Sequence, residues 1–173
     1  TEFFAGGDPN RLVFSYNVTD AHNLLISSVL EPGDHAITTC LEHNSVLRPM
    51  YMHRERGVEV DFVPFDRAGY VDPEDIRRRI RPNTRLVVVN HGSNVIGTIQ
   101  PVAEVGEICR RHGVLFAVDV AQTAGLVDID IAEMKIDVTC FTGHKSLFGP
   151  TGTGGMYMAE HVDLMPCRSG ALC

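Results

Sequence analysis

The alternation of apolar strand patterns with helical patterns is the feature that most constrains the fold of this chain. Residues 86–89 read Leu-Val-Val-Val and residues 114–118 read Val-Leu-Phe-Ala-Val. Continuous runs of this kind are typical of strands that are covered on both faces. A helical pattern over residues 101–112, ended by Gly113, separates the two runs. Strands that alternate with helices favour a parallel sheet between two layers of helices. We therefore expect a three-layer α/β/α fold around a mostly parallel sheet.

The rest of the chain continues this pattern. Thr19 or Asn17 is expected to cap the first helix, Ser45 the second and Asp72 the third, because short polar side chains satisfy the free N–H groups of a first turn. Further strands are expected at residues 12–15, 35–40, 58–65, 138–141 and 154–159, and further helices at residues 19–30, 45–56, 72–81 and 131–134.

Length, charge and cysteine usage exclude several classes of protein. The 173 residues are enough for one domain with a substantial core, and the net charge of -7 argues against a nucleic-acid or anionic-membrane partner. No apolar stretch approaches the roughly 20 residues that span a bilayer. Five cysteines without a Cys-x-x-Cys pair predict a reducing, cytoplasmic location and no zinc site. We expect Cys40, Cys109 and Cys140 to be core thiols.

Polar side chains follow one expected strand after another. Ligands of open α/β sheets bind outside the carboxyl ends of the strands, so these residues are candidates for one site. Each alone has a plain structural explanation: Asp119 as a turn residue, His43 as a loop histidine, Asn94 as a turn former, and Lys145 as a surface lysine. The full set of candidates, with Val18 included for its backbone N–H, is Asn17, Val18, Thr19, Asp20, Glu42, His43, Asn94, Asp119, Gln122, Thr142, His144 and Lys145.

Taken together, these residues match the chemical requirements of a pyridoxal 5'-phosphate site. Lysine forms a Schiff base with a carbonyl cofactor and arginine cannot replace it, and the chain has only two lysines, Lys135 and Lys145. Asp119 can keep the pyridine nitrogen protonated, and His43 can stack on the ring. A phosphate needs N–H groups at a helix start together with hydroxyls or a cation. The turn formed by Asn17, Val18 and Thr19, with Thr142 and His144, can provide them.

The sequence resembles the fold-type I pyridoxal-phosphate enzymes of the aminotransferase class V group, and most closely the cysteine desulfurases and selenocysteine lyases. The resemblance covers roughly residues 10 to 160 in conserved order and spacing. The segments that carry it are residues 17–21, 32–34, 42–45, 93–98, 118–122, 143–145 and 149–152.

This resemblance implies roles for the matched residues. Lys145 would be the Schiff-base lysine, Asp119 the pyridinium partner, and His43 the ring-stacking residue that assists proton transfer. Gln122 would bond the phenolic oxygen, with Asn94 near that oxygen and the substrate carboxylate. The phosphate would be held by Thr19, Thr142 and His144 with the backbone N–H groups of Val18 and Thr19. The implied reaction removes sulfur from L-cysteine to give alanine and an enzyme persulfide, in a homodimer that passes sulfur to an acceptor protein.

The chain also departs from the family pattern. We expect residues 1–160 to be an incomplete cofactor-binding large domain and residues 161–173 a tail, with the small C-terminal domain absent. No cysteine matches the nucleophile of the family, and residues 168–173 replace a segment that normally reaches the partner's phosphate. An aminotransferase, an epimerase, a β-lyase and a truncated cofactor-binding domain without turnover remain alternatives. A nucleotide-binding module is weaker, because no Gly-x-Gly-x-x-Gly or phosphate-loop lysine motif is present.

Overall fold

The computed structural model describes residues 8–165, which form a single seven-stranded sheet with four α-helices. A short 3₁₀ turn at Pro9–Arg11 precedes the sheet. The strands are β1 (Leu12–Ser15), β2 (His35–Thr39), β3 (Glu59–Val63), β4 (Thr84–Asn90), β5 (Leu115–Asp119), β6 (Val138–Thr142) and β7 (Gly154–Met158). The helices are α1 (Val18–Val29), α2 (Asn44–Glu55), α3 (Pro73–Arg79) and α4 (Val102–His112).

The strand order is β1-β7-β6-β5-β4-β2-β3. Pairing is parallel from β3 through β2, β4 and β5 to β6, whereas β7 is antiparallel to both β6 and β1. The expected mostly parallel sheet is therefore confirmed. Since β2, β4, β5 and β6 run in the same direction, the segments that follow them leave the sheet at the same end.

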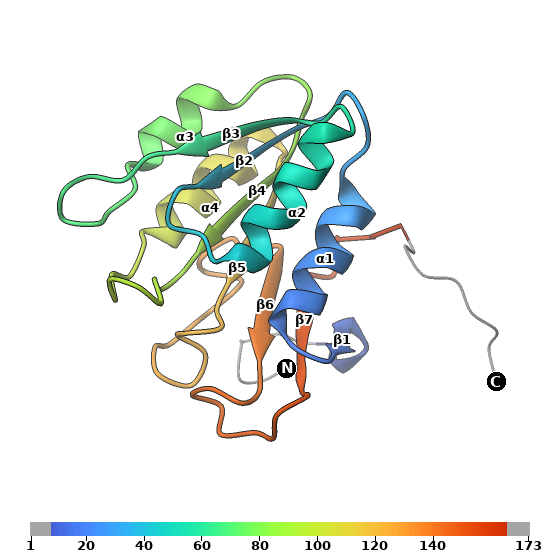
Figure 1. Cartoon of the computed structure of the whole chain (residues 1–173), viewed down its shortest axis with the longest axis vertical. Coiled ribbons are helices and arrows are strands. Elements are labelled where there is room, and N and C mark those ends of the chain that lie inside the picture. Colours follow the sequence, from blue (N-terminus) through green and yellow to red (C-terminus); the bar gives the residue numbers. More distant parts are fainter. Residues whose placement is uncertain (1–7, 166–173) are drawn as a thin grey trace.

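Helices cover both faces of the sheet, with α1 and α2 on one side and α3 and α4 on the other (Figure 1). The alternation of side chains along β4 explains how one strand serves both layers. Leu86 and Val88 pack in the cluster that contains the buried residues of α1 and α2, and Val87 and Val89 pack in the cluster under α3 and α4. Each fully buried side chain of this size contributes about 1.5–3 kcal/mol of hydrophobic stabilisation.

The helix starts agree with the sequence in two of three cases. Asn17 caps α1 and accepts a hydrogen bond from Asp20 N, and Asp72 caps α3 and accepts one from Glu74 N. The expected Ser45 cap of α2 is wrong. His43 is the cap instead, because its Nδ1 accepts from Ser45 N at 3.1 Å, and the Ser45 hydroxyl lies 2.9 Å from the same nitrogen.

Two other expectations are wrong. Residues 131–134 form turns rather than a helix, because this segment packs directly on α4: a Cβ added at Gly106 would lie 2.0 Å from Met134 O. Lys135 ends the segment with a positive φ of 55°. Cys40 is exposed in the turn after β2, whereas Cys109 and Cys140 are buried as expected.

The expectation of a tail at residues 161–173 can be compared with the structure only up to residue 165. Cys167, Cys173 and most of the tail at residues 161–173 lie outside the described residues. Within residues 8–165, no helix has the length and apolar character that a membrane crossing requires.

Candidate active site

Of the ten residues to which the sequence assigns a cofactor role, six line one cavity at the carboxyl end of the parallel strands. The start of α1, the turn after β2, the loop after β4, the end of β5 with the turn that follows it, and the loop after β6 each contribute. The lining residues are Val18, His43, Asn90, Gly92, Asn94, Asp119, Ala121, Gln122 and Lys145. The sequence therefore identified most of this wall, and it missed Asn90, Gly92 and Ala121.

Asp119 is the last residue of β5 and its side chain is buried. Its Oδ1 accepts a hydrogen bond from Ala121 N at 2.8 Å, which fixes the carboxylate at the carboxyl end of β5. Cys140 is its register partner on β6. Burial, together with the nearby Asp119 charge, raises the pKa of the Cys140 thiol well above its usual value. This cysteine therefore stays a thiol beneath the site.

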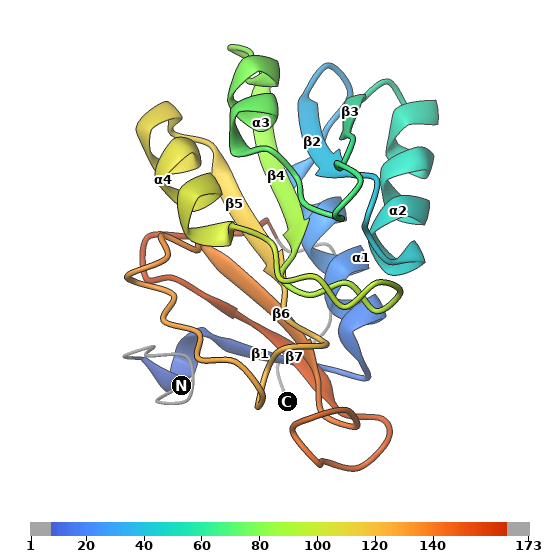
Figure 2. The same ribbon diagram turned by 90° about the vertical axis from the view of Figure 1, so that its left-hand side faces the viewer.

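Lys145 lies in the loop between β6 and β7, which projects from the lower edge of the molecule (Figures 1 and 2). Gly143 N donates to Thr153 O at 2.8 Å and Gly149 N donates to Gly143 O at 2.7 Å, so hydrogen bonds tie the two ends of the loop together. A Cβ at Gly143 would lie 2.2 Å from Thr153 Oγ1. Glycine at position 143 therefore allows the close approach that fixes the base of the lysine loop.

The four remaining predicted residues, Asn17, Thr19, Thr142 and His144, lie beside the cavity rather than on its lining. Thr142 ends β6 and pairs in register with Gly154, and a Cβ at Gly154 would lie 2.7 Å from Asn17 Cα. The capped start of α1 is therefore held against the ends of β6 and β7. Thr142 Oγ1 and His144 Nδ1 are 3.0 Å apart, which makes them one hydrogen-bonded pair.

The structure adds two residues that the sequence interpretation missed, His22 and Ser45. Both are buried. His22 Nδ1 is 3.1 Å from Ser45 Oγ, and Ser45 Oγ is 2.9 Å from His43 Nδ1. His22 Nε2 is 3.9 Å from Asp119 Oδ2. A signal was present in the sequence: His22 follows Val18 by one helical turn on a face that is otherwise apolar.

Glu42 is a buried carboxyl group behind the site. Its Oε1 accepts from Thr39 Oγ1 at 2.8 Å and from Asn90 N at 2.9 Å. Burial raises the pKa of Glu42 to about 8, and the Asp119 charge adds to this effect. At neutral pH the group is mostly protonated, so it packs beside Asp119 without adding a second full negative charge.

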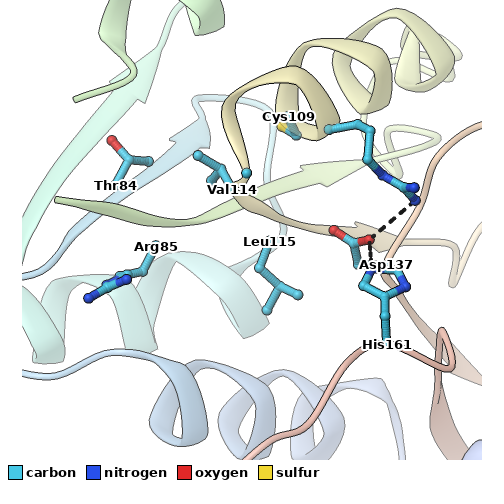
Figure 3. A pocket seen from close by; sticks show the side chains of 9 residues that line it. Thr84, Arg85, Cys109, Val114, Leu115, Asp137 and His161 are labelled. Atoms are coloured by element: carbon cyan, nitrogen blue, oxygen red, sulfur yellow. Dashed lines mark hydrogen bonds and ion pairs between the residues drawn. The ribbon is translucent and has the colours of Figure 1, made fainter. Parts of the chain in front are cut away.

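A second cavity of ≈ 340 Å³ lies at the opposite end of the sheet and contains none of the predicted site residues (Figure 3). Asp137 is its central polar group. Asp137 Oδ2 accepts from Phe116 N at 2.8 Å, and Oδ1 lies 2.8 Å from His161 Nε2. Arg110 is 3.9 Å from the same Oδ1. These contacts tie α4 and the segment after β7 to the start of the central strands, which is a structural function.

The chain is a three-layer α/β/α protein in which a lysine, a carboxylate and a histidine line one cavity at the carboxyl end of the sheet. The chain belongs to the aminotransferase class-V family, whose pattern matches residues 1–171. Among curated relatives it is 38% identical over 170 residues to a probable cysteine desulfurase of Methanothermobacter thermautotrophicus, covering 96% of this chain and 42% of the relative. It is 31% identical over 169 residues to the cysteine desulfurase IscS of Dictyoglomus turgidum, covering 95% of this chain and 43% of the relative.

The chain is also similar to a solved structure. The structure of SspA in complex with cysteine superposes with a TM-score of 0.91 at 31% identity, over 98% of this chain and 51% of that one. The α/β fold expected from the sequence is thereby confirmed. The chain spans about two fifths of the length of the two curated relatives.

Proposed function

We propose that the chain is the cofactor-binding part of a pyridoxal-phosphate enzyme that removes sulfur from L-cysteine. The observation that carries this proposal is the convergence of Lys145, Asp119 and His43 on one cavity. The chain has one other lysine, Lys135, and it lies outside that cavity in the turn before β6. The family membership and the desulfurase relatives support the same reaction.

The residues present fit the cofactor by their chemistry. An amine, a carboxylate and an imidazole line the cavity together, and several buried polar atoms around it have no hydrogen-bond partner among the described residues. These atoms are His22 Nε2, Glu42 Oε2 and Asn90 Oδ1. Buried polar groups are normally hydrogen-bonded. Unpartnered polar atoms around the cavity therefore favour the binding of a polar ligand there.

The start of α1 fits a phosphate. Asn17 satisfies Asp20 N, while the N–H groups of Val18 and Thr19 have no hydrogen-bond acceptor within the part of the chain that the structure describes. Free N–H groups and the positive end of a helix dipole favour an anion. Thr142 and His144 stand at the end of the strand beside this helix start and would complete the phosphate site.

Pyridoxal phosphate would supply an electrophilic aldehyde and a ring that accepts electron density. Lys145 Nζ would hold the aldehyde and then remove the proton from the substrate Cα. Asp119 would hold a proton on the ring nitrogen, and His43 would cover the ring and assist proton transfer. Gln122 and Asn94 would orient the phenolic oxygen and the substrate carboxylate. A cysteine thiolate would take the sulfur as a persulfide, leaving alanine.

The whole protein would act as a homodimer and pass the persulfide sulfur to an acceptor protein. The support for this step is the resemblance to desulfurases, not a contact within residues 8–165. The acidic chain, with its net charge of -7, favours no nucleic-acid or membrane partner.

Reductive labelling tests the proposal. The protein is incubated with pyridoxal phosphate, reduced with borohydride and digested, and the labelled peptide is identified by mass spectrometry. We expect a yellow protein before reduction and a label on the peptide that contains Lys145. Lys145→Arg should lose the label, whereas Lys135→Arg is the matched control and should keep it. A label on Lys135, or equal labelling in both variants, would refute the assignment.

A turnover assay on the whole protein then tests the reaction. L-Cysteine and a thiol acceptor are supplied, and alanine and sulfide are measured in equal amounts if the proposal is right. Formation of pyruvate and ammonia would indicate a β-lyase, and racemised substrate would indicate an epimerase.

A further inference from the structure

Ser45 is a buried polar side chain at the start of α2 that the proposed roles do not include. Only 4% of its surface is exposed, and its hydroxyl lies between two histidines. Ser45 Oγ is 2.9 Å from His43 Nδ1 and 3.1 Å from His22 Nδ1. A hydroxyl has one proton to donate, so it cannot donate to both rings. The ring that receives this proton decides what His43 presents to the candidate site.

The backbone determines the state of His43 Nδ1. This nitrogen accepts a hydrogen bond from Ser45 N at 3.1 Å, and a backbone N–H can only donate. His43 Nδ1 therefore carries a lone pair, and in the neutral ring the single proton lies on Nε2. A proton on Nδ1 would face the Ser45 N–H and break this cap of α2. The ring nitrogen that is left for the cavity lined by His43 is thus an N–H donor.

The direction of the Ser45 hydroxyl proton follows from the same geometry. If it pointed to His22, the lone pairs of Ser45 Oγ and His43 Nδ1 would face each other at 2.9 Å. If it points to His43, both contacts of the hydroxyl are hydrogen bonds, because His22 can then donate from Nδ1 to Ser45 Oγ at 3.1 Å. The chain of donors therefore runs from the Nδ1–H of His22 through the Ser45 hydroxyl to His43 Nδ1.

The surroundings of His22 agree with this arrangement. The side chain is 1% exposed; burial lowers the pKa of His22, Asp119 opposes this shift, and His43 adds to it. The ring is therefore neutral at pH 7 and carries a single N–H. With that proton on Nδ1, Nε2 has a lone pair 3.9 Å from Asp119 Oδ2. This repulsion is weaker than that of two lone pairs at 2.9 Å, because electrostatic energy falls with distance.

We propose that Ser45 is a positioning residue that holds His43 as the Nε2–H tautomer, with His22 orienting the Ser45 hydroxyl. His43 then offers the bound cofactor and substrate a hydrogen-bond donor and cannot take up a proton at Nε2. An acceptor atom of the ligand, a carboxylate or a thiolate, would face it, and removal of the substrate Cα proton would be left to Lys145. The positions of the protons follow from the contacts above, whereas this catalytic consequence rests on the proposed function.

His35, at the opposite end of the sheet, is a matched control. It is buried at the start of β2, and its Nδ1 is 2.8 Å from Thr84 Oγ1. Thr84 Oγ1 accepts from Arg81 N at 2.7 Å, and His35 Nε2 lies 3.3 Å from Asp61 Oδ2. A carboxylate at that distance favours a proton on Nε2, so the Thr84 hydroxyl donates to Nδ1. His35 and His22 should therefore be opposite tautomers, although both contact a hydroxyl through Nδ1.

The first experiment needs no cofactor. The whole protein is labelled with ¹⁵N-histidine, and the ring signals are assigned by their loss in His22→Asn, His43→Asn and His35→Asn. From the nitrogen shifts and one-bond N–H couplings we expect the Nδ1–H tautomer for His22 and the Nε2–H tautomer for His43 and His35. A His22 ring protonated on Nε2, or a His43 ring protonated on Nδ1, would overturn the proposal.

Substitutions then test whether Ser45 connects the two rings. Ser45→Ala removes the hydroxyl and keeps the backbone N–H, so the signals of both His22 and His43 should move, whereas Thr84→Ala should move only those of His35. His22→Leu should also move the His43 signals. His22→Asn should leave them near the wild type, because its amide nitrogen stands at the position of Nδ1 and donates. His43 signals that ignore both Ser45→Ala and His22→Leu would show that no such connection exists.

The second experiment measures turnover of L-cysteine by the cofactor-loaded whole protein. Ser45→Ala should lower kcat by about three- to tenfold, the effect of one lost hydrogen bond, and leave the affinity for pyridoxal phosphate unchanged. Ser45→Thr retains the hydroxyl and should restore most of the rate. In a His43→Ala background, Ser45→Ala should have no further effect, because Ser45 acts only through His43. Thr84→Ala is the control and should leave kcat unchanged.

The outcomes separate the two proposals. An unchanged kcat in Ser45→Ala, or an equal loss with and without His43, overturns the positioning role, while a Lys145-labelled protein that turns over cysteine still upholds the proposed function. A wild type that takes no label on Lys145 refutes the proposed function, and the ring signals of the first experiment still decide the positions of the protons. If Ser45→Ala does not fold, the comparison of His22→Leu with His22→Asn decides instead.

Discussion

Asp119 and Asp137 occupy opposite ends of neighbouring strands, and both side chains are buried. Asp137 has protein partners on both oxygens: Phe116 N on Oδ2, and His161 with the more distant Arg110 on Oδ1. Among the described residues, Asp119 has one close partner, Ala121 N on Oδ1, while Oδ2 lies 3.9 Å from Nε2 of His22. A fully paired buried carboxylate stabilises the fold, whereas one with an unused oxygen can bind a ligand. This difference supports the proposal that the ligand binds at the Asp119 end of the sheet.

The largest expected effect is on catalysis at the Asp119 end. In the whole, cofactor-loaded protein, Asp119→Asn should slow exchange of the substrate Cα proton by at least about a hundredfold, or roughly 2.7 kcal/mol. Asparagine keeps an acceptor for Ala121 N but cannot hold a proton on the ring nitrogen as an anion does. Deuterium exchange measured by NMR checks this, with Asp137→Asn as the control that should exchange normally. Unchanged exchange in Asp119→Asn would mean that another group faces the nitrogen.

The next effect is on stability at the Asp137 end. Asp137→Asn should lower the free energy of unfolding by about 2–3 kcal/mol, because one amide cannot accept from both Phe116 N and His161 and leaves a buried group unpaired. Urea denaturation measures the free energy of unfolding of Asp137→Asn and of Asp119→Asn. Asp119→Asn should lose less than about 1 kcal/mol of it. Equal losses would show that the two carboxylates do not differ in the way proposed.

Glu42 predicts an effect that is spread over several pH units. Its folded pKa, about 8, is above its ordinary value of 4.5, so the folded state binds the proton more tightly. The associated stability is fully present below pH 4.5 and is lost as pH rises toward and through 8. Glu42→Gln should therefore flatten the fall in unfolding free energy between pH 5 and 8 by about 3–4 kcal/mol. Urea melts at several pH values measure this, and a slope equal to that of the wild type would contradict the raised pKa.

The smallest effect compares two helix caps. Asn17→Ala and Asp72→Ala should each cost about 1 kcal/mol of unfolding free energy, because each removes a side-chain acceptor from a first-turn N–H. Only Asn17→Ala should also weaken binding of pyridoxal phosphate, since α1 starts at the site and α3 does not. Fluorescence titration with the cofactor distinguishes them. Equal affinities would remove α1 from the phosphate site.

The fold was predictable because apolar strand patterns alternate with helical patterns along the sequence. Residues 86–89 form the central part of β4 and supply side chains to both layers, which is why the run is uniformly apolar. The turn at residues 131–134 was not predictable, because its shape depends on a close contact with Gly106 on α4. The cap of α2 was also missed, since either Ser45 or His43 can accept a hydrogen bond and only the backbone geometry selects between them.

The position of the candidate site was predictable where its residues follow strands directly. Asp119 and the lysine loop come immediately after β5 and β6, so the direction of the sheet brings them together. His22 and Ser45 were missed because they lie inside helices, where a sequence pattern assigns them to the core or to a cap. Their relation to Asp119 depends on how α1 and α2 pack over the sheet, which no local pattern reveals.

The buried thiol of Cys140 has a consequence for the proposed removal of sulfur from cysteine. Sulfur transfer requires a thiolate as the attacking group, and burial raises the pKa of both Cys109 and Cys140 far above neutrality. In the proposed reaction, neither side chain would act as the nucleophile that takes the sulfur. Among the cysteines at residues 8–165, only Cys40 is exposed to reagents from outside. The proposed sulfur transfer would therefore depend on a thiol more accessible than those of Cys109 and Cys140.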